Sequence, residues 1–402
     1  MIKLRRFHIA TDEEIKSGLT SDIYYIRTKE IIEKKNMNRE VVAEISVGKL
    51  PRNWEWGVLC GIEELVYLYE GVSVDVFALP EGTIFPKRDI NGIKVPLVEI
   101  IGRYGNFVSI ETATLGFLCQ ASGVATAAAR IKKLAKGKEV LAFGIRRMHP
   151  AISPMLDRAA YVGGFDGVSG ILGAKLIGIK PAGTMPHTLI LIFGDQASAW
   201  KAFDEVIDPS VPRIALVDTM WDEKYEGILA AETLKNKLNG IRLDTPGSRK
   251  GDFLEIIREV RWELNLRGYN HVKIYVSGGM DEKTVKTLAE GPVDGFGVGT
   301  WISNAPTIDF SMDIVEVEGK PISKRGKLSG RKKPWRCNSC YTWKVTPFNI
   351  DSIKCPNCGN DMIFMLRKYI EGGKIVGVLE SPKEIREYVL KQLERYSLED
   401  LD

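Results

Sequence analysis

Short apolar runs follow one another along the middle of the chain, and stretches with apolar residues at helical spacing separate most of them. The runs predict strands at 140–147, 165–169, 176–179, 214–218, 240–244, 272–276 and 294–298. Between the last three runs, residues 252–267 and 281–289 are expected to form helices. Strands that alternate with helices build a parallel sheet, so about seven of them predict a parallel αβ barrel, one strand short of the usual eight.

The chain on either side of this region mixes both kinds of element. A capped helix is expected after Thr20-Ser21-Asp22, a second helix over 54–69, and strands over 41–47, 72–79 and 95–101. Residues 106–134 are apolar and rich in small side chains, which predicts a closely packed helix pair that bridges two domains. Ser381-Pro382 is expected to open a surface helix that runs to about residue 396.

These patterns indicate an α/β protein with several parts. The parts are an N-terminal α+β domain at 1–108, the barrel domain at 109–305, a segment at 306–330 that leaves the barrel, a small cysteine-containing module at 331–370, and a helical tail at 371–402.

Composition narrows the class of protein. The chain has 402 residues and a formal net charge of +4, which is too small to indicate a nucleic-acid partner. No apolar run approaches the roughly 20 residues that a membrane helix needs. The N-terminus lacks the apolar core of a signal peptide, because Thr11-Asp-Glu-Glu14 follows it closely. We therefore expect a cytoplasmic protein without a membrane partner.

Two glycine-rich turns follow consecutive predicted strands. The first is Ser277-Gly278-Gly279, and the second leads into Gly299-Thr300. Glycine lets an anion approach the backbone closely, successive N–H groups at the start of a helix offer donors, and the two hydroxyl groups add to them. The turns predict a phosphate-binding site. The alternative is that the glycines serve only the geometry of the turns.

Charged residues end three of the predicted strands. Arg242 and Asp244 are two residues apart, so a strand projects both to one side; this predicts a functional pair at the barrel mouth, or else a solvent-exposed ion pair. Arg146 and Arg147 suit a phosphate or a carboxylate, but neighbours on a strand face opposite ways, so at most one would face the mouth. Asp218 is open to three roles, which are to bind Mg²⁺, to brace Arg242 or to cap the next helix.

Four of the six cysteines form two C-x-x-C pairs separated by fourteen residues, namely Cys337, Cys340, Cys355 and Cys358. This spacing predicts a small ribbon folded around one tetrahedral Zn²⁺ with four thiolate ligands. Iron bound in the manner of rubredoxin is the alternative. We expect the ribbon to serve structural stability or an oligomer contact rather than nucleic-acid binding.

Three motifs carry a resemblance to a known family. Arg-Leu-Asp-Thr-Pro-Gly from Arg242, Val-Ser-Gly-Gly-Met-Asp from Val276 and Phe-Gly-Val-Gly-Thr from Phe296 resemble the phosphate-binding half of the type II phosphoribosyltransferases, specifically nicotinate phosphoribosyltransferase. The resemblance covers about residues 1–330, where Asp22-Ile-Tyr24 and Gly183-Thr-Met-Pro-His187 also match. It implies an incomplete barrel of about seven strands and a segment at 306–330 that returns to the N-terminal domain as a strand pair. Only some members of this family carry a zinc ribbon.

The resemblance implies roles that the residues alone leave open. Tyr24 would stack on nicotinate in the barrel of a neighbouring subunit, Thr184 would lie at the nicotinate, and Arg242 would pair with its carboxylate. His187 matches the residue that ATP phosphorylates in members that couple ATP hydrolysis to synthesis. Without the resemblance, Tyr24 is more simply a core aromatic residue, and His187 is more simply a satisfied loop residue.

The implied reaction transfers phosphoribosyl from phosphoribosyl pyrophosphate to nicotinate and gives nicotinate mononucleotide and pyrophosphate. Mg²⁺ would neutralise the pyrophosphate, and Asp244 would lie near the ribose hydroxyls or the metal. A homodimer or higher homo-oligomer with shared active sites is implied as well. Quinolinate and nicotinamide are the competing substrates. The alternative from another class is a non-catalytic zinc-ribbon protein that binds nucleic acid.

Overall fold

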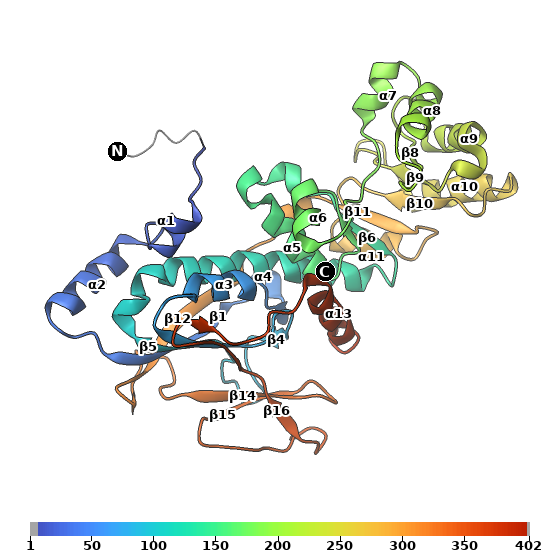
Figure 1. The fold of residues 1–402 in the computed structure, drawn as a ribbon. Coiled ribbons are helices and arrows are strands. Elements are labelled where there is room, and N and C mark those ends of the chain that lie inside the picture. Colours follow the sequence, from blue (N-terminus) through green and yellow to red (C-terminus); the bar gives the residue numbers. More distant parts are fainter. Residues whose placement is uncertain (1–6, 400–402) are drawn as a thin grey trace. The chain divides into compact units, whose positions relative to one another are not determined.

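The computed structural model describes residues 7–399 and divides into two compact units (Figure 1). The first unit takes in the chain up to Thr126 and again Pro306–Glu399, and the second takes in Ala127–Ala305. The boundary therefore lies within helix α4 (Glu111–Leu134) rather than at the expected position 108. Within the described residues, no helix is long and apolar enough to cross a membrane.

Helix α4 also corrects a second expectation, because residues 106–134 form one long helix preceded by short 3₁₀ turns and not a helix pair. The small residues of this helix let neighbouring segments of the chain pack closely against it. A Cβ atom at Gly123 would lie 2.2 Å from the carbonyl oxygen of Pro306, so only glycine admits the returning chain there. Ser122 and Thr126 accept hydrogen bonds from the backbone N–H groups of Cys60 and Val58, at 3.0 and 2.8 Å.

In the part of the chain that is described, the first unit is built on a seven-stranded antiparallel sheet in the order β13-β12-β1-β5-β3-β17-β18. The returning segment joins this sheet because β12 pairs with β1 and forms a hairpin with β13, which agrees with the expected strand pair. The strands are β1 (Glu40–Lys49), β3 (Val74–Ala78), β5 (Pro96–Arg103), β12 (Asp309–Val317), β13 (Lys320–Pro321), β17 (Arg367–Glu371) and β18 (Lys374–Ile375).

The helix expected over 54–69 is only half correct. Residues Trp56–Val58 form strand β2, which pairs with β4 (Ile84–Pro86), and helix α3 begins later at Ile62–Tyr69. Gly61 separates the two elements with a φ of 97°, and a Cβ atom there would lie 2.6 Å from the carbonyl oxygen of Phe117. A helix cannot continue through a residue in that conformation.

The remaining elements of the first unit are short helices and a three-stranded sheet. The predicted C-terminal helix is confirmed as α13, where Ser381 and Glu384 form a capping box around its first turn. These elements are α1 (Asp12–Lys16), α2 (Ile23–Lys34), α13 (Pro382–Leu393), β14 (Lys332–Cys337), β15 (Trp343–Pro347) and β16 (Met362–Phe364).

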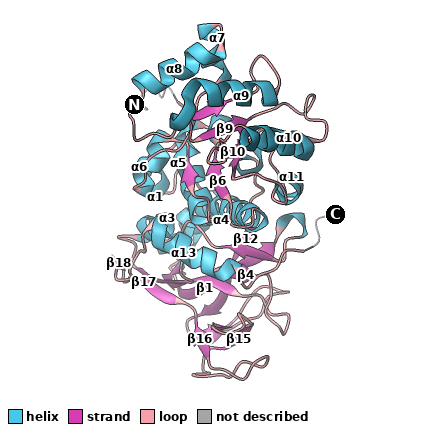
Figure 2. Ribbon diagram, turned by 90° about the vertical axis from the view of Figure 1, so that its right-hand side faces the viewer, coloured by secondary structure: helices cyan, strands magenta, loops and turns pink. Residues whose placement is uncertain are grey.

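Across residues 127–305, the second unit contains a six-stranded parallel sheet in the order β7-β6-β11-β10-β9-β8. Its strands are short and mostly buried. In Figure 2, helices α9, α10 and α11 lie beside strands β9 and β10. The strands are β6 (Glu139–Ala142), β7 (Gly167–Val168), β8 (Ile214–Leu216), β9 (Gly240–Leu243), β10 (Lys273–Val276) and β11 (Gly295–Val298).

The helices of this unit follow the sheet strands in the chain. The two helices predicted over 252–267 and 281–289 are confirmed as α10 and α11. The full set is α5 (Ser153–Val162), α6 (Ile171–Ile177), α7 (His187–Phe193), α8 (Gln196–Val206), α9 (Glu223–Leu234), α10 (Phe253–Leu266), α11 (Glu282–Leu288) and α12 (Thr300–Ser303).

The sheet differs from the expected barrel of about seven strands. The apolar run at 176–179 is not a strand, because it ends helix α6, and Gly178 closes that helix with a φ of 84°. Ala174 and Ile177 are buried and Leu176 is exposed, as on one side of a helix. Among residues 7–399 six parallel strands are present, and no ladder joins β7 to β8.

Candidate active site

Charged and hydroxyl side chains meet at the carboxyl ends of strands β8, β9 and β10. Asp218 follows β8, Arg242 lies in β9 with Asp244 just beyond it, and Ser277 follows β10. Tyr275 pairs with Arg242 in the parallel register, which brings Ser277 beside Asp244. Parallel sheets bind ligands at this edge, beyond the carboxyl ends of their strands.

Asp244 lies at the centre of this group. Its carboxylate accepts a hydrogen bond from Ser277 Oγ at 2.7 Å and lies 3.3 Å from Arg242 Nη1 and 3.6 Å from His187 Nε2. Burial acts to raise the pKa of Asp244, but the hydrogen bond from His187 and the charge of Arg242 outweigh it and lower the pKa to about 2. The side chains of Arg242 and Asp244 are only 11% and 28% exposed, so the alternative of a solvent-exposed ion pair is wrong.

Arg242 is fixed from both sides. Its Nη1 donates to Ser277 Oγ at 3.1 Å, and its Nη2 donates to the carbonyl oxygen of Met185 at 2.9 Å. Its Nε has no partner among the residues that the structure describes. Burial lowers the pKa of Arg242, while the charge of Asp244 opposes that change, and a guanidinium remains protonated at any physiological pH. A buried positive charge is thus held next to the loop that contains Thr184.

His187 is the first residue of helix α7 and faces two carboxylates. Its Nδ1 is hydrogen bonded with Thr219 Oγ1 at 3.0 Å, and its Nε2 lies 3.6 Å from Asp244 Oδ2 and 3.9 Å from Asp218 Oδ1. The hydrogen bond to Asp244 raises the pKa of His187, although burial opposes it. The side chain is 38% exposed, so a ligand can reach the ring. These contacts make His187 part of the group of charged side chains at the strand ends.

Asp218 fixes the turn after strand β9, a role that the sequence did not suggest. Its Oδ2 accepts from the backbone N–H of Asp244 at 2.5 Å and from Thr245 Oγ1 at 3.1 Å, which fixes the turn after β9. Helix α9 is capped by Asp222, so Asp218 does not cap it. Burial raises the pKa of Asp218 to about 6, and its Oδ1 is buried without a hydrogen-bond partner among residues 7–399.

The first glycine turn has the conformation that its sequence predicts. Gly278 and Gly279 have φ angles of 79° and 73°, which residues with a side chain rarely adopt. Lys250 donates a hydrogen bond to the carbonyl oxygen of Gly278. Ser277 is buried and already donates its hydroxyl hydrogen to Asp244. The backbone of the turn, and not the Ser277 hydroxyl, is therefore the part available to an anion.

The second glycine turn lies next to the arginine pair. A Cβ atom at Gly299 would be 4.0 Å from Arg147 Nη1, and Thr300 begins the short helix α12. Arg146 and Arg147 are exposed and belong to a 3₁₀ turn at Ile145–Arg147, so the strand predicted to run to residue 147 ends at Ala142. The strand rule that sends neighbouring side chains to opposite faces does not apply to this turn.

Comparison with known proteins agrees with this geometry. Models for the N-terminal and C-terminal domains of quinolinate phosphoribosyl transferase match residues 22–122 and 124–313. The crystal structure of nicotinate-nucleotide pyrophosphorylase from Pyrococcus furiosus is 55% identical, covers 99% of this chain and 100% of that chain, and has a TM-score of 0.94. The chain belongs to the family of nicotinate phosphoribosyltransferase-type proteins.

Further relatives carry the name of this family. A nicotinate phosphoribosyltransferase of Mycobacterium tuberculosis is 28% identical over 361 residues, which cover 79% of this chain and 75% of that protein. The human nicotinic acid phosphoribosyltransferase structure shares the fold, with a TM-score of 0.74 at 20% identity over 94% of each chain.

In this family member, sequence reasoning missed several residues of the candidate site. Thr219 holds His187, Thr245 lies 3.1 Å from Asp218 Oδ2 and 2.6 Å from Glu223 Oε1, and Lys250 binds the glycine turn. Lys250 follows the Thr-Pro-Gly turn after β9, so a lysine in a loop after a candidate strand end was an available signal. No such signal in the sequence pointed to Thr219 or Thr245, because the residues that they contact come from other segments of the chain.

The family motif Asp22-Ile-Tyr24 lies in the first unit, on helix α2. Tyr24 is 54% exposed, so the alternative of a core aromatic residue is wrong for it. Its ring lies 4.2 Å from that of Tyr25, centroid to centroid, and the Tyr25 hydroxyl donates to Glu111 at 2.5 Å. Asp22 does not cap helix α2 through its side chain and instead accepts from Thr112 Oγ1 at 3.2 Å. Tyr24 is therefore exposed to solvent, and its ring packs against Tyr25, which the hydrogen bond to Glu111 holds in place.

The four cysteines come together as their spacing predicts. The sulfur atoms of Cys337, Cys340, Cys355 and Cys358 all lie within 4.8 Å of one another. A tetrahedral zinc site with Zn–S bonds of about 2.3 Å needs sulfur atoms about 3.8 Å apart, so the cluster has the dimensions of such a site. Trp335 and Met362 pack against two of the cysteines and shield this four-cysteine cluster.

Proposed function

We propose that this protein transfers a phosphoribosyl group from phosphoribosyl pyrophosphate to the ring nitrogen of nicotinate. The observation that carries the proposal is the buried Arg242 guanidinium, fixed between Ser277 and Met185 at the same strand ends as the two glycine turns. A cation for a carboxylate and an N–H-lined turn for a phosphate are the two binding elements that this reaction needs.

The acceptor follows from the charge of the site. Arg242 offers one buried cation, which matches the single carboxylate of nicotinate. Nicotinamide is neutral and would lack the charge-assisted contact that a carboxylate makes with a guanidinium, so we expect it to bind less tightly. Thr184 lies one residue before Met185, whose carbonyl oxygen accepts from Arg242, which supports a contact between Thr184 and the nicotinate.

The donor would be bound by the glycine turns. The backbone at Gly278, Gly279 and Gly299 accepts close approach of the 5′-phosphate, and the exposed Arg147 beside Gly299 adds a cation. Mg²⁺ would bind at the carboxylate of Asp218, whose buried Oδ1 accepts no hydrogen bond from the described residues and lies 3.9 Å from His187 Nε2, since hard cations prefer oxygen ligands. The ion would neutralise charge on the leaving pyrophosphate.

The chemical step requires that the two reactants be correctly oriented, and it requires no proton transfer. The nitrogen of nicotinate attacks carbon 1 of the ribose with its lone pair while the bond to pyrophosphate breaks, so no base is required. Positive charge develops on the ribose ring, and the Asp244 carboxylate with its pKa of about 2 stays ionised to stabilise it. Arg242 and Ser277 hold that carboxylate in place.

His187 supports coupling to ATP as a second part of the proposal. Because Nε2 faces Asp244, its hydrogen is expected there, so the Nδ1 lone pair accepts from Thr219 and becomes the nucleophile when that hydrogen bond opens. Attack of Nδ1 on the γ-phosphorus of ATP would release ADP, and the Nε2 proton would pass to Asp244. Labelling with γ-³²P ATP tests this step, and an equal label in a His187→Gln variant would contradict it.

Two structural features complete the proposal. The four-cysteine cluster would bind a structural Zn²⁺. The protein would act as a homodimer in which Tyr24 reaches a neighbour's site, since helix α2 and the turn before it expose apolar side chains that a partner could cover, namely Leu19, Ile23, Tyr24 and Ile31.

The test is product analysis by mass spectrometry after incubation with phosphoribosyl pyrophosphate, Mg²⁺ and one of three pyridines. Nicotinate mononucleotide and pyrophosphate are expected from nicotinate, and a much lower rate from quinolinate and nicotinamide. Arg242→Ala is expected to lose the activity, and Arg258→Ala, an exposed arginine on helix α10, serves as the matched control.

Quinolinate is the second candidate acceptor. The 55% identical relative is named a nicotinate-nucleotide pyrophosphorylase, and this name does not specify nicotinate as the acceptor. Its two carboxylates would require a second cation, for which Arg146 and Arg147 are exposed nearby. Faster turnover with quinolinate than with nicotinate would establish this alternative. No product from any pyridine, together with salt-dependent binding of nucleic acid, would instead support a non-catalytic protein.

A further inference from the structure

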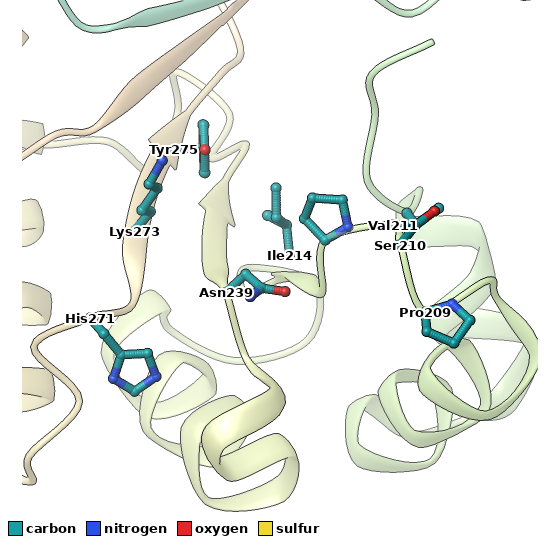
Figure 3. A pocket seen from close by; sticks show the side chains of 9 residues that line it. Pro209, Ser210, Val211, Ile214, Asn239, His271, Lys273 and Tyr275 are labelled. Carbon is teal, nitrogen blue, oxygen red and sulfur yellow. The ribbon is translucent and has the colours of Figure 1, made fainter. Parts of the chain in front are cut away.

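A cavity of about 420 Å³ opens at the opposite end of the parallel sheet from the candidate active site. It lies where strands β8, β9 and β10 begin, and the loop before β8 forms its other side (Figure 3). Its volume falls in the range of about 300–1,000 Å³ that is usual for small-molecule sites. The lining residues are Pro209, Ser210, Val211, Pro212, Ile214, Asn239, His271, Lys273 and Tyr275.

The loop wall of this cavity is held rigidly by one buried arginine. Arg213 is 6% exposed and donates to the carbonyl oxygens of residues 204, 207, 208 and 211 and to the carboxylate of Asp204. Asp208 in turn accepts from the backbone N–H of Ser210 at 2.8 Å. A loop fixed at so many points presents Pro209, Val211 and Pro212 as a preformed apolar surface.

The charge inside the cavity has one sign. Lys273 and His271 are basic, and none of the nine lining residues carries a carboxylate. The Asn239 side-chain oxygen accepts from the N–H of Arg213 at 2.7 Å, so its NH₂ group is the part left to donate. Within residues 7–399, Lys273 Nζ makes no hydrogen bond or ion pair, whereas the Ser210 side chain is hydrogen bonded with the Asp208 carboxylate, so the donors left for an occupant are Lys273 and the Asn239 NH₂ group. These donors therefore suit an anion.

The inner end of the cavity is closed to a second anion. The Tyr275 hydroxyl donates to Glu139 Oε2 at 2.7 Å, so a carboxylate stands behind the tyrosine ring. Burial and this hydrogen bond raise the pKa of Tyr275, which keeps the phenol protonated. In Figure 3, Lys273 and Tyr275 lie across from Pro209, Ser210 and Val211. An occupant thus has a cationic, donor-rich side and an apolar side.

We propose that this cavity binds an organic phosphate of mononucleotide size, with its phosphate at Lys273 and Asn239 and its ring along the loop of residues 209–212. Inorganic phosphate would use the donors but leave the apolar wall uncovered. The phosphate-binding turns of the candidate active site lie at the other ends of these strands, so the two sites are separate. The proposal does not depend on the transferase function.

Calorimetric titration of the full-length protein with AMP, in the absence of other substrates, tests the site. Lys273→Ala and Val211→Glu are each expected to weaken AMP binding at least tenfold. The control Lys283→Ala changes an exposed lysine of helix α11 outside the cavity, and it is expected to bind AMP as the wild type does. Circular dichroism and thermal melting confirm that each variant is folded.

Three results would overturn the proposal. They are no AMP binding by the wild type, equal affinity of Lys273→Ala and wild type, and loss of AMP binding in Arg242→Ala, which would place AMP in the candidate active site. Equal affinity for AMP and inorganic phosphate would show an adventitious ion only and would also refute it. Because the readout is binding, a protein without transferase activity can still pass this test.

Discussion

Replacing Asp244 with asparagine tests the charge network at the strand ends. Asparagine keeps the shape and an oxygen that accepts from Ser277, but it removes the negative charge that lies 3.3 Å from Arg242 Nη1 and 3.6 Å from His187 Nε2. The pKa of His187 is expected to fall in this variant, because the hydrogen bond to Asp244 is the largest cause of its raised value.

The size of the effect on stability follows from the pKa of Asp244. A pKa lowered from 3.8 to about 2 corresponds to roughly 2 kcal/mol of favourable interaction in the ionised state. The side chain is 28% exposed, so water screens part of this interaction. We therefore expect Asp244→Asn to lower the free energy of unfolding by about 1 kcal/mol at neutral pH.

The loss of unfolding free energy in Asp244→Asn is expected to become smaller both at acidic and at basic pH. The contribution of Asp244 is present above its ordinary pKa of 3.8 and is lost as the pH falls through about 2. The contribution of His187 is full below its ordinary pKa of 6.5 and is lost as the pH rises through the raised value. The difference in stability between wild type and variant should be largest between pH 3.8 and 6.5.

The assay is an NMR titration of the His187 ring protons, assigned by comparison with His187→Gln, together with urea unfolding at pH 5.5 and 8.5. Asp195→Asn is the matched control, because Asp195 caps helix α8 and asparagine caps equally well. An unchanged pKa of His187 in Asp244→Asn, or an equal fall in the control, would refute the network.

Further predictions concern activity, metal and stability. Arg242→Ala should reduce kcat/KM roughly 10- to 100-fold with an unchanged circular dichroism spectrum, since it removes a charge-assisted contact, and near-native kcat/KM would exclude Arg242 from the site. Cys355→Ser should lose the Zn²⁺ measured by mass spectrometry in wild type, and full zinc at normal stability would contradict the assignment. Tyr24→Ala and Arg242→Ala, each inactive alone, should recover activity when co-refolded, because a mixed dimer contains one intact site; confirmed mixed dimers without recovery would show that Tyr24 serves no neighbour. Glu282→Gln should lower the free energy of unfolding by about 3 kcal/mol in urea, because it removes the negative charge 2.8 Å from Nε of the buried Arg130, and a loss below about 1 kcal/mol would contradict this.

Local periodicity was enough to predict the elements whose burial follows one face. Helix α10 is an example, since Phe253, Ile257, Val260 and Leu264 recur at helical spacing and all four are buried. The cysteine pairs were predictable in the same way, because two short hairpin turns bring ligands together wherever the rest of the chain lies. The glycine turn after β10 also follows from its own residues, because two positive φ angles in succession require glycine.

Other features depend on contacts between distant segments. The run at 176–179 is as apolar as a buried strand, and only packing, which buries Ile177 and leaves Leu176 exposed, makes it the end of a helix. Likewise, Asp218 and Asp244 follow neighbouring strands β8 and β9, and His187 begins helix α7, yet its Nε2 lies 3.9 Å from the carboxylate of Asp218 and 3.6 Å from that of Asp244. A sequence lists such side chains in order, but their distances and pKa values depend on the strand register and on the water that folding removes.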